Sequence, residues 1–336
     1  LHKDVPTSVK HAKGLTTLQV PERLGDLRGR ALLAKFAAGT TPPPMPSDET
    51  SEDYQWQGKT LKRTVRTLVL GGEKMEFVKV PAGNFLMGSP ASDKDGEDDE
   101  KPQHKVTFTK GLWVAKYPVT KGQFAAFVKA TKYKTEAEKD GEGGWGYDEA
   151  TNKLEGRKAK YTWEKTGWPQ SDKHPVVNVS WNDAKAYYEW AAKESKKPIR
   201  LLTEEEYEYA NRAGSTTRYF TGDDVESLKG YANTRDKSFK AKFKDSTTTV
   251  FDDGEAFSSP VGKYKPNGFG LYDMTGNVYS WCEDRNIGKR TVEKDVALRG
   301  GGWQNEPSNF RAASRLPNPP EFLYCTFGFR VCCAPD

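Results

Sequence analysis

Residues 267–281 read Asn267-Gly-Phe-Gly-Leu-Tyr-Asp-Met-Thr-Gly-Asn-Val-Tyr-Ser-Trp281. The stretch is rich in glycine and oxygen-bearing side chains, and neither helical nor strand periodicity explains it. Its glycine-bearing turn offers the side chain of Asp273. Similar long, aperiodic stretches lie elsewhere in the second half of the chain. We therefore expect an α+β domain with much irregular structure, which needs more than backbone ladders to hold its loops.

Short strands and amphipathic helices surround these loops. Apolar patterning around glycine-marked turns predicts strands at residues 77–80, 85–87 and 105–108. Each predicted helix begins at a Ser or Thr that is followed three residues later by Gln, Asp or Glu; these capping residues are Thr120, Ser180 and Thr203. The apolar stripe of each helix is interpreted as core packing.

The composition is that of a globular domain and excludes several functional classes. The chain has 336 residues, 35% of them hydrophobic, with 9 Trp, 15 Tyr and 16 Phe to fill a core. No apolar run approaches the roughly 20 residues that a membrane-spanning helix needs. The 52 Lys and Arg are interleaved with 47 Asp and Glu, so the net charge of +5 does not indicate a nucleic-acid-binding protein.

The chain divides at a proline-rich stretch. Residues 40–54 contain three consecutive prolines followed by Ser, Asp and Glu, which is typical of a linker. We therefore predict an N-terminal extension and linker over residues 1–54 and one main domain over residues 55–336. The chain begins with neither a signal-peptide pattern nor a Met, so the compartment is open, with the cytoplasm as default and export as the alternative.

Common catalytic motifs are scarce. The four histidines, at positions 2, 11, 104 and 174, lack the i, i+3 or i+4 spacing of a helical metal site. The sequence contains neither a nucleophile elbow nor a phosphate-binding loop. The acidic run Asp93–Glu100 lacks the spacing of a calcium-binding loop and is expected to be solvated. Asn233 and Asp253 are better candidates, because both lie in aperiodic loops that a hard cation could join.

Seven blocks of the sequence resemble the formylglycine-generating-enzyme (sulfatase-modifying factor) family, whose fold is a variant of the C-type lectin fold. They follow the family's order and occupy residues 80–89, 117–124, 174–184, 202–209, 267–281, 299–303 and 328–330. One block alone is a weak signal, whereas seven in order are specific. The resemblance covers about residues 74–334 and implies a C-type lectin-like α+β fold, rich in loops, with short antiparallel strands and few helices.

The resemblance also implies two calcium sites. They fall on Asn233, Thr234, Asp253 and Glu255 for the first site, and on Asp273, Gly276 and Val278 for the second. Asn233 and the two aspartates would offer side-chain oxygens, and the other four residues backbone carbonyls. At the second site Ser280 stands where the family usually has a glutamate, and Asp273 where it usually has an asparagine. The alternative is that hydrogen bonds of Asp and Asn side chains alone hold these turns.

The oxidases of the family carry two cysteines after the Gly-Gly-Ser-Tyr/Trp element, and these bind copper and perform the thiol chemistry. Here the corresponding residues 303–311 contain no cysteine. Hard oxygen and amide donors cannot replace thiolates at a Cu(I) centre. The adjacent Cys332 and Cys333 would point to opposite faces of a strand, so they are poorly placed to bind one metal ion together. Cys325 is expected in a loop where it could react, but one cysteine alone does not specify a reaction. We therefore predict no catalytic residue, no copper and no formylglycine reaction.

The second candidate site is a variable binding segment at residues 303–327. Residues that match the family's blocks alternate there with positions that follow no pattern. Its apolar run at residues 322–326 is unusual for a surface loop, and aromatic residues exposed on a rigid scaffold are typical of a binding surface. The predicted binding residues are Trp303, Asn305, Ser308, Asn309, Phe310, Leu316, Asn318, Phe322, Leu323, Tyr324, Cys325 and Thr326.

This layout resembles the variable proteins of diversity-generating retroelements, in which such a segment is rewritten to give a new receptor surface. The resemblance implies a binding protein whose ligand is an unknown protein or surface ligand; the oligomeric state stays open. Three alternatives remain: ordinary drift in a non-catalytic family member, an oxidase or accessory enzyme with an altered active site, and the branch of the family that acts in siderophore maturation.

Overall fold

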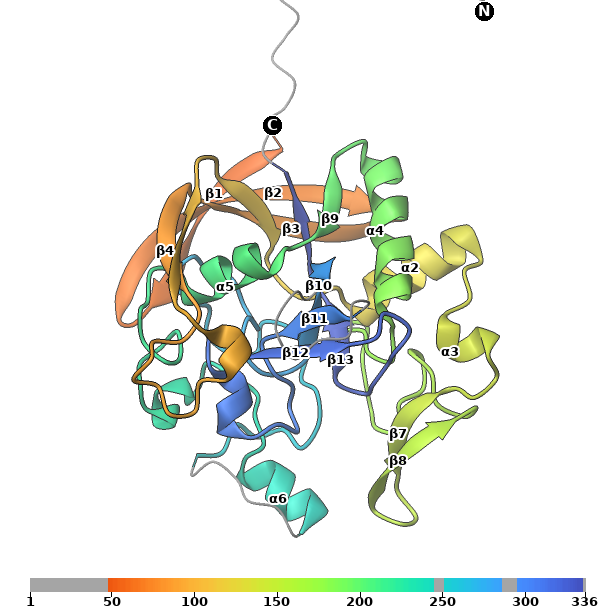
Figure 1. Ribbon diagram of the computed structural model, residues 1–336. Coiled ribbons are helices and arrows are strands. Elements are labelled where there is room, and N and C mark those ends of the chain that lie inside the picture. The colour runs from red at the N-terminus through yellow and green to blue at the C-terminus, as the bar shows by residue number, and fades with distance from the viewer. Residues whose placement is uncertain (1–47, 245–250, 286–294, 335–336) are drawn as a thin grey trace, which may run out of the picture. The chain divides into compact units, whose positions relative to one another are not determined.

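The computed structural model describes residues 48–244, 251–285 and 295–334 (Figure 1). A compact unit begins at Asp48. Its first strand, β1 (Glu49–Trp56), pairs along its whole length with β2 (Lys59–Leu70). The domain therefore begins before residue 55, the boundary predicted from the sequence. The acidic residues that suggested a linker suit an exposed edge strand, and one of them, Glu52, forms an ion pair with Arg63 of β2 at 2.6 Å.

Two main sheets and two hairpins organise the described strands. The larger sheet has the order β1-β2-β3-β6-β14-β9, and the smaller sheet has the order β12-β11-β10-β13. The remaining strands of the larger sheet are β3 (Glu73–Val80), β6 (Leu112–Ala115), β9 (Ile199–Leu201) and β14 (Val331–Cys333). Those of the smaller sheet are β10 (Tyr279–Arg285), β11 (Val296–Arg299), β12 (Arg315–Asn318) and β13 (Phe327–Phe329). The hairpins are β4 (Gly83–Met87) with β5 (His104–Phe108) and β7 (Gly144–Asp148) with β8 (Lys153–Lys158).

The strands agree with the predicted α+β class. The three strands expected before residue 110 are confirmed as β3, β4 and β5. All strand pairs within the sheets and hairpins are antiparallel except β10 and β13, which run parallel.

The three predicted helices begin where the capping boxes placed them. Thr120, Ser180 and Thr203 are the N-caps of α2, α4 and α5, and each caps its helix reciprocally with the residue three positions later. The helices of the described residues are α2 (Lys121–Thr131), α3 (Glu136–Lys139), α4 (Trp181–Ser195), α5 (Glu204–Arg212) and α6 (Lys237–Phe243), with 3-10 turns η1 (Asp98–Glu100), η2 (Val225–Leu228) and η3 (Pro307–Phe310).

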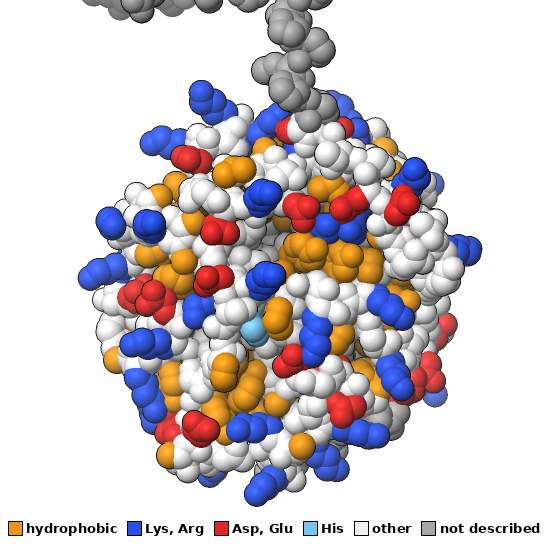
Figure 2. Space-filling model, turned by 180° about the vertical axis from the view of Figure 1, so that it is seen from behind, with side chains coloured by type: hydrophobic (Ala, Val, Ile, Leu, Met, Phe, Trp, Pro, Cys, Tyr) orange, Lys and Arg blue, Asp and Glu red, His pale blue; other side chains and the backbone are white. Residues whose placement is uncertain are grey.

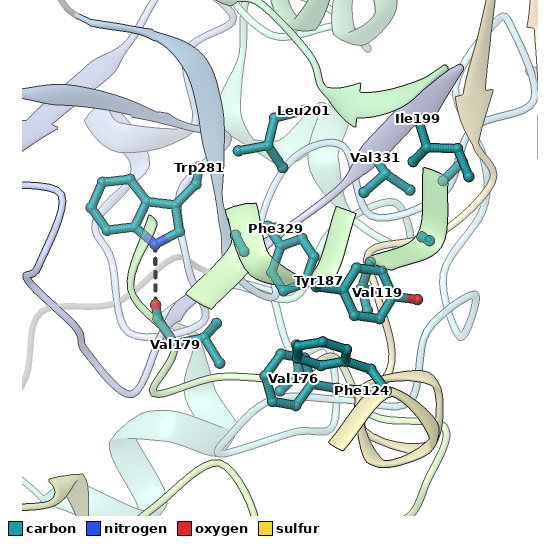
Figure 3. Close-up of a cluster of buried hydrophobic side chains, with 14 of the residues drawn as sticks. Val119, Phe124, Val176, Val179, Tyr187, Ile199, Leu201, Trp281, Phe329 and Val331 are labelled. Atoms are coloured by element: carbon teal, nitrogen blue, oxygen red, sulfur yellow. Dashed lines mark hydrogen bonds between the residues drawn. The ribbon is translucent and has the colours of Figure 1, made fainter. Parts of the chain in front are cut away.

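Two hydrophobic clusters lie on opposite faces of the larger sheet. The first cluster joins the sheet to α2, α4 and the smaller sheet. Figure 3 shows the interior of this cluster, where the Trp281 indole donates a hydrogen bond to the carbonyl of Val179 at 3.1 Å. The other cluster packs α5 against the opposite face. Cys333 belongs to the first cluster and Cys332 to the second, so the predicted opposite orientation of these two thiols is confirmed.

Buried polar contacts hold the aperiodic turn of residues 267–281 in place. Gly276 has φ +77°, and a Cβ there would lie 2.3 Å from the carbonyl oxygen of Asn233, so only glycine fits. The N–H of Asn277 donates to the same carbonyl at 2.9 Å. Arg330, fully buried, donates to the carbonyl of Asp273 at 3.1 Å, and burial lowers the pKa of its guanidinium to about 10. These contacts fix the turn against the loop that carries Asn233.

Candidate binding segment and cation site

Residues 303–326 run from the smaller sheet outward and back again. After β11 the chain passes through η3, returns as the edge strand β12, and re-enters the sheet at β13. An edge strand has one side without a strand partner, so its backbone and side chains lie near the surface. All four residues of β12 are half-buried.

The structure buries five of the twelve predicted binding residues, and these do not belong to an exposed surface. They are Trp303, Phe310, Leu323, Cys325 and Thr326, each at most 1% exposed. Trp303 packs against Trp168 and Phe257, with ring centroids 5.7 and 5.4 Å apart. Much of the segment's apolar character therefore serves the core, because aromatic residues distant in sequence cover it.

The remaining seven residues lie at or near the surface. Phe322 and Ser308 are exposed, and five are half-buried: Asn305, Asn309, Leu316, Asn318 and Tyr324. The ring of Tyr324 lies 4.7 Å from the half-buried Trp145. The backbone N–H of Trp181, at the start of α4, donates to the carbonyl of Pro320 at 3.0 Å. We call Trp145, Trp181, Phe322 and Tyr324 the aromatic surface.

Two arginines of the segment anchor it through buried ion pairs. Arg311 forms a bidentate pair with Glu100, with N–O distances of 2.5 and 2.9 Å, and both side chains are almost fully buried. The Nε of Arg315 donates to Glu204 of α5 at 2.9 Å. The acidic run Asp93–Glu100 is therefore not uniformly solvated as expected, because its last residue is a buried partner of Arg311.

A third buried pair lies behind the segment. Glu208 of α5 accepts hydrogen bonds from Arg299 of β11, and from Arg212 Nε and the N–H of Gly88 at 2.9 Å each. Arg299 also donates to the carbonyl of Ala313 at 2.8 Å, within the segment. Sequence reasoning missed these residues. The available signal was the i, i+4, i+8 spacing of Glu204, Glu208 and Arg212, which places them on one face of α5.

The four cysteines lie in the hydrophobic core. All of them are fully buried. Burial raises the pKa of the Cys282, Cys325 and Cys332 thiols, which disfavours the thiolate that copper requires. Cys325 was expected in a loop where it could react, but its side chain packs in the cluster around Trp303. Among the described residues, no group of three or more His, Cys, Asp or Glu side chains could hold a metal ion.

The first predicted calcium site has unsatisfied buried oxygens, which a carbonyl-rich cation site would use. Asn233 is fully buried; its Nδ2 donates to the carbonyl of Phe257 at 2.8 Å, but its Oδ1 has no hydrogen-bond partner. The N–H of Thr234 donates to Asp253 Oδ2 at 2.7 Å, and the N–H of Glu255 to Oδ1 at 3.0 Å. The four residues of this site therefore lie together.

The charge at this site is also uncompensated. Burial raises the pKa of Asp253 to about 7, and the neighbouring charge of Asp236 adds to the shift. Asp236 is fully buried and accepts the N–H of Asp253. Two close carboxylates and an orphan amide oxygen fit a hard cation. Asp236 was missed from the sequence; in the structure it is the N-cap of α6, where its side chain accepts the N–H of Phe239 at 3.0 Å.

The second predicted calcium site is less suited to a cation than the first. Asp273 Oδ2 accepts the N–H of Gly262 at 2.8 Å, and its Oδ1 accepts the side-chain amide of Asn277 at 3.2 Å. The charge of Arg330 also lies close enough to lower the pKa of this carboxyl, against the larger effect of burial, which raises it. Gly276 and Val278 lie in the same buried turn. Both carboxylate oxygens of Asp273 have donors, as those of Asp253 do, but here the buried Arg330 supplies a positive charge, so these residues fit an ion less well than those of the first site.

Comparison with known proteins identifies the class to which this fold and segment belong. A model of the sulfatase-modifying factor enzyme 1-like domain matches residues 68–335, so the chain belongs to the sulfatase-modifying factor family. It is 34% identical to the formylglycine-generating enzyme of Mus musculus, over 78% of this chain and 75% of that protein. It is 33% identical to the inactive C-alpha-formylglycine-generating enzyme 2 of Bos taurus, over 79% of this chain and 90% of that protein.

Solved structures agree with the predicted C-type lectin-like fold. PvdO from Pseudomonas aeruginosa superposes with a TM-score of 0.61 at 32% identity, over 77% of this chain and 94% of that one. Variable protein 1 of Treponema denticola superposes with a TM-score of 0.58 at 18% identity, over 81% and 99% of the two chains. The fold is therefore shared by an enzyme family and by a variable protein. No helix of the described residues is long and apolar enough to cross a membrane.

Proposed function

We propose that this chain is a non-catalytic binding protein whose aromatic surface holds a protein ligand. One observation supports this most directly: Phe322 and Tyr324 of the aromatic surface lie on a segment whose own arginines form ion pairs with buried carboxylates, Arg311 with Glu100 and Arg315 with Glu204. A segment fixed in this way loses little conformational entropy when a ligand binds. Half-exposed Trp, Tyr and Phe side chains supply large contact areas at low entropy cost.

We further propose that the exposed positions of the segment can be exchanged without refolding the domain. Ser308, Asn318 and Phe322 lie at or near the surface, whereas Arg311 and Trp303 belong to the scaffold. This division fits a variable protein of a diversity-generating retroelement. The neighbouring genome provides the check: a reverse transcriptase and a near-identical repeat of this coding segment are expected beside the gene, and their absence would contradict this part of the proposal.

The competing function is an oxidase or accessory enzyme with an altered active site. Sequence identity does not separate the two, because the active mouse enzyme and the inactive bovine protein match at 34% and 33%. The burial of the thiols favours a binding function over an oxidase function. Each family oxidase needs two accessible cysteines, whereas the segment's one cysteine, Cys325, is fully buried.

Replacing Phe322 and Tyr324 by serine is expected to weaken ligand binding at least about tenfold, because truncating aromatic anchors typically costs 1 kcal/mol or more each. The assay is a display screen of the wild-type domain against surface proteins, followed by affinity measurement of each selected ligand with the variant. The matched control is Leu86→Ser, which removes another exposed apolar side chain, 48% exposed on β4. Equal affinity of the double variant and the wild type, with both folded, would refute the aromatic surface as the binding site.

We also propose that one calcium ion stabilises the scaffold at Asn233 and Asp253. An ion there would satisfy the orphan Oδ1 of Asn233 and offset the charges of Asp236 and Asp253. A ligand that binds only the folded state stabilises it by about 2.7 kcal/mol when its free concentration is about 100-fold above Kd.

Chelation of calcium is therefore expected to lower the melting temperature by several degrees, measured by thermal unfolding in calcium and in EGTA. The Asp253→Asn variant should lose this response, whereas Asp223→Asn, at an exposed acid outside the site, should keep it. Identical melting curves of the wild type in calcium and in EGTA would overturn the calcium proposal.

A further inference from the structure

A group of lysines lies at one end of the domain, on and beside α6. The group consists of Lys153, Lys237, Lys240, Lys242 and Lys244, and we call it the lysine patch. Four of the five side chains are exposed, and Lys242 is half-buried with its Nζ 4.6 Å from the centre of the Tyr147 ring. Lys237, Lys240 and Lys244 lie at i, i+3 and i+7, so they share one face of the helix and its C-cap.

The β7–β8 hairpin brings Lys153 to the same place. The side-chain amide of Asn152 donates to the carbonyl of Lys242 at 2.8 Å, and Lys153 is the next residue in the chain. Phe243 of α6 packs edge-on against Tyr147 of β7, with ring centroids 5.9 Å apart. Lys153 and the lysines of α6 therefore come from two elements that pack against each other.

The patch is not neutralised by the described part of the domain. No described carboxylate forms an ion pair with any of the five ammonium groups, whereas Lys116 lies between Glu52 and Glu76 at 2.8 and 3.3 Å. The nearby Asp252 accepts a hydrogen bond from the hydroxyl of Ser238 at 2.6 Å; this bond and, to a smaller extent, the charge of Lys237 lower the pKa of the Asp252 carboxyl. Like charges close together on a helix destabilise it slightly, so the clustered lysines do not stabilise the fold.

The lysine patch borders the predicted binding segment. Phe239 and Phe243, on the inner side of α6, pack against Trp303 with ring centroids 5.8 and 6.4 Å apart. Just before α6, Arg235 forms an ion pair with Glu306 of the segment at 3.2 Å. A ligand that covers the outer part of the segment near Glu306 would therefore also meet the lysines.

We propose that the lysine patch binds an acidic stretch of the protein ligand, adjacent to the site on residues 303–326. This inference rests on the proposed binding function and names the chemistry of the partner. Charge complementarity supports it: five lysines that form no ion pair with a described carboxylate favour carboxylate side chains and raise the rate of encounter with an acidic surface.

An acidic protein fits the patch better than a membrane or a nucleic acid. The two aromatic side chains of α6 point inward, with Phe239 buried and Phe243 half-buried, and the exposed apolar residue of the helix is only the small Ala241, so α6 has no large apolar side chain to enter a bilayer. On the face shown in Figure 2, basic and acidic side chains are interspersed, so no broad positive surface extends across it.

The test measures binding of the full chain to poly-L-glutamate at 25 and 200 mM salt, with phosphatidylserine vesicles and duplex DNA as parallel probes. The triple variant Lys237→Glu, Lys240→Glu and Lys244→Glu is expected to bind poly-L-glutamate at least about tenfold more weakly than the wild type at low salt, because exposed charges are less screened there. The matched control changes the same net charge at exposed lysines outside the patch: Lys59→Glu, Lys105→Glu and Lys110→Glu. It is expected to retain binding within about twofold.

Equal weakening by the two triple variants would overturn the proposal, because net charge and not the patch would then govern binding. Absence of wild-type binding to poly-L-glutamate would overturn it too. If binding depends on the patch but is tighter for the vesicles or the DNA, the ligand of the patch is a lipid or a nucleic acid and not an acidic protein. The aromatic-surface variant at Phe322 and Tyr324 keeps all five lysines, so failure of this inference is distinguishable from failure of the proposed binding function.

Discussion

The Glu208→Ala substitution is expected to lower the free energy of unfolding by about 3–5 kcal/mol, the usual cost of removing one partner of a buried ion pair. Glu208 is fully buried and accepts hydrogen bonds from Arg299, Arg212 and the N–H of Gly88. Its removal leaves the buried guanidinium of Arg212 without its carboxylate, and leaves Arg299 only the more distant carboxylate of Glu204, at 3.8 Å. Urea denaturation of the two proteins, followed by tryptophan fluorescence, measures the difference.

The matched control is Glu189→Ala on α4. The side chain of Glu189 is 61% exposed, and its contact with Lys185 is 3.8 Å, so its loss is expected to change the free energy of unfolding by no more than about 0.5 kcal/mol. A change below about 1 kcal/mol for Glu208→Ala would contradict the account, because the anchor behind the segment would then contribute little to stability.

Copper(I) is expected to find no tight site on this protein. Residues 303–311 offer Gln, Asn, Glu and Ser side chains, which are hard ligands. All four thiols are buried, so they form no exposed cysteine pair. Burial also raises the pKa of Cys282, Cys325 and Cys332, so copper would have to compete with a proton at each. Competition with a coloured Cu(I) chelator measures this: the chelator should retain the metal, whereas a family oxidase with its cysteine pair should remove it.

Local sequence patterns predicted three of the described helices and three of the described strands. The capping boxes at Thr120, Ser180 and Thr203 placed three helix starts correctly, because capping depends on residues three positions apart. The strand β1 was missed because its acidic and polar residues read as a continuation of the proline-rich linker. Pairing with β2, which no local pattern shows, makes it a strand.

The candidate sites were harder to predict, because burial in irregular loops depends on residues far away in the chain. Trp303 read as a surface aromatic, but Trp168 and Phe257 cover it. Glu100 read as part of a solvated acidic loop, but it lies 211 positions before its partner Arg311. Asn233 and Asp253 were chosen because both lie in aperiodic loops, and the N–H of Thr234, next to Asn233, does donate to Asp253; whether they bind calcium stays a prediction.

The most direct test of the central claim, that this domain holds a ligand and does not convert one, is incubation of the protein with copper and a sulfatase-type cysteine peptide, followed by mass spectrometry of the peptide. The account predicts that the peptide is recovered unchanged, while a family oxidase treated in parallel converts its cysteine to formylglycine. Conversion of the peptide over several turnovers by this chain would contradict the account.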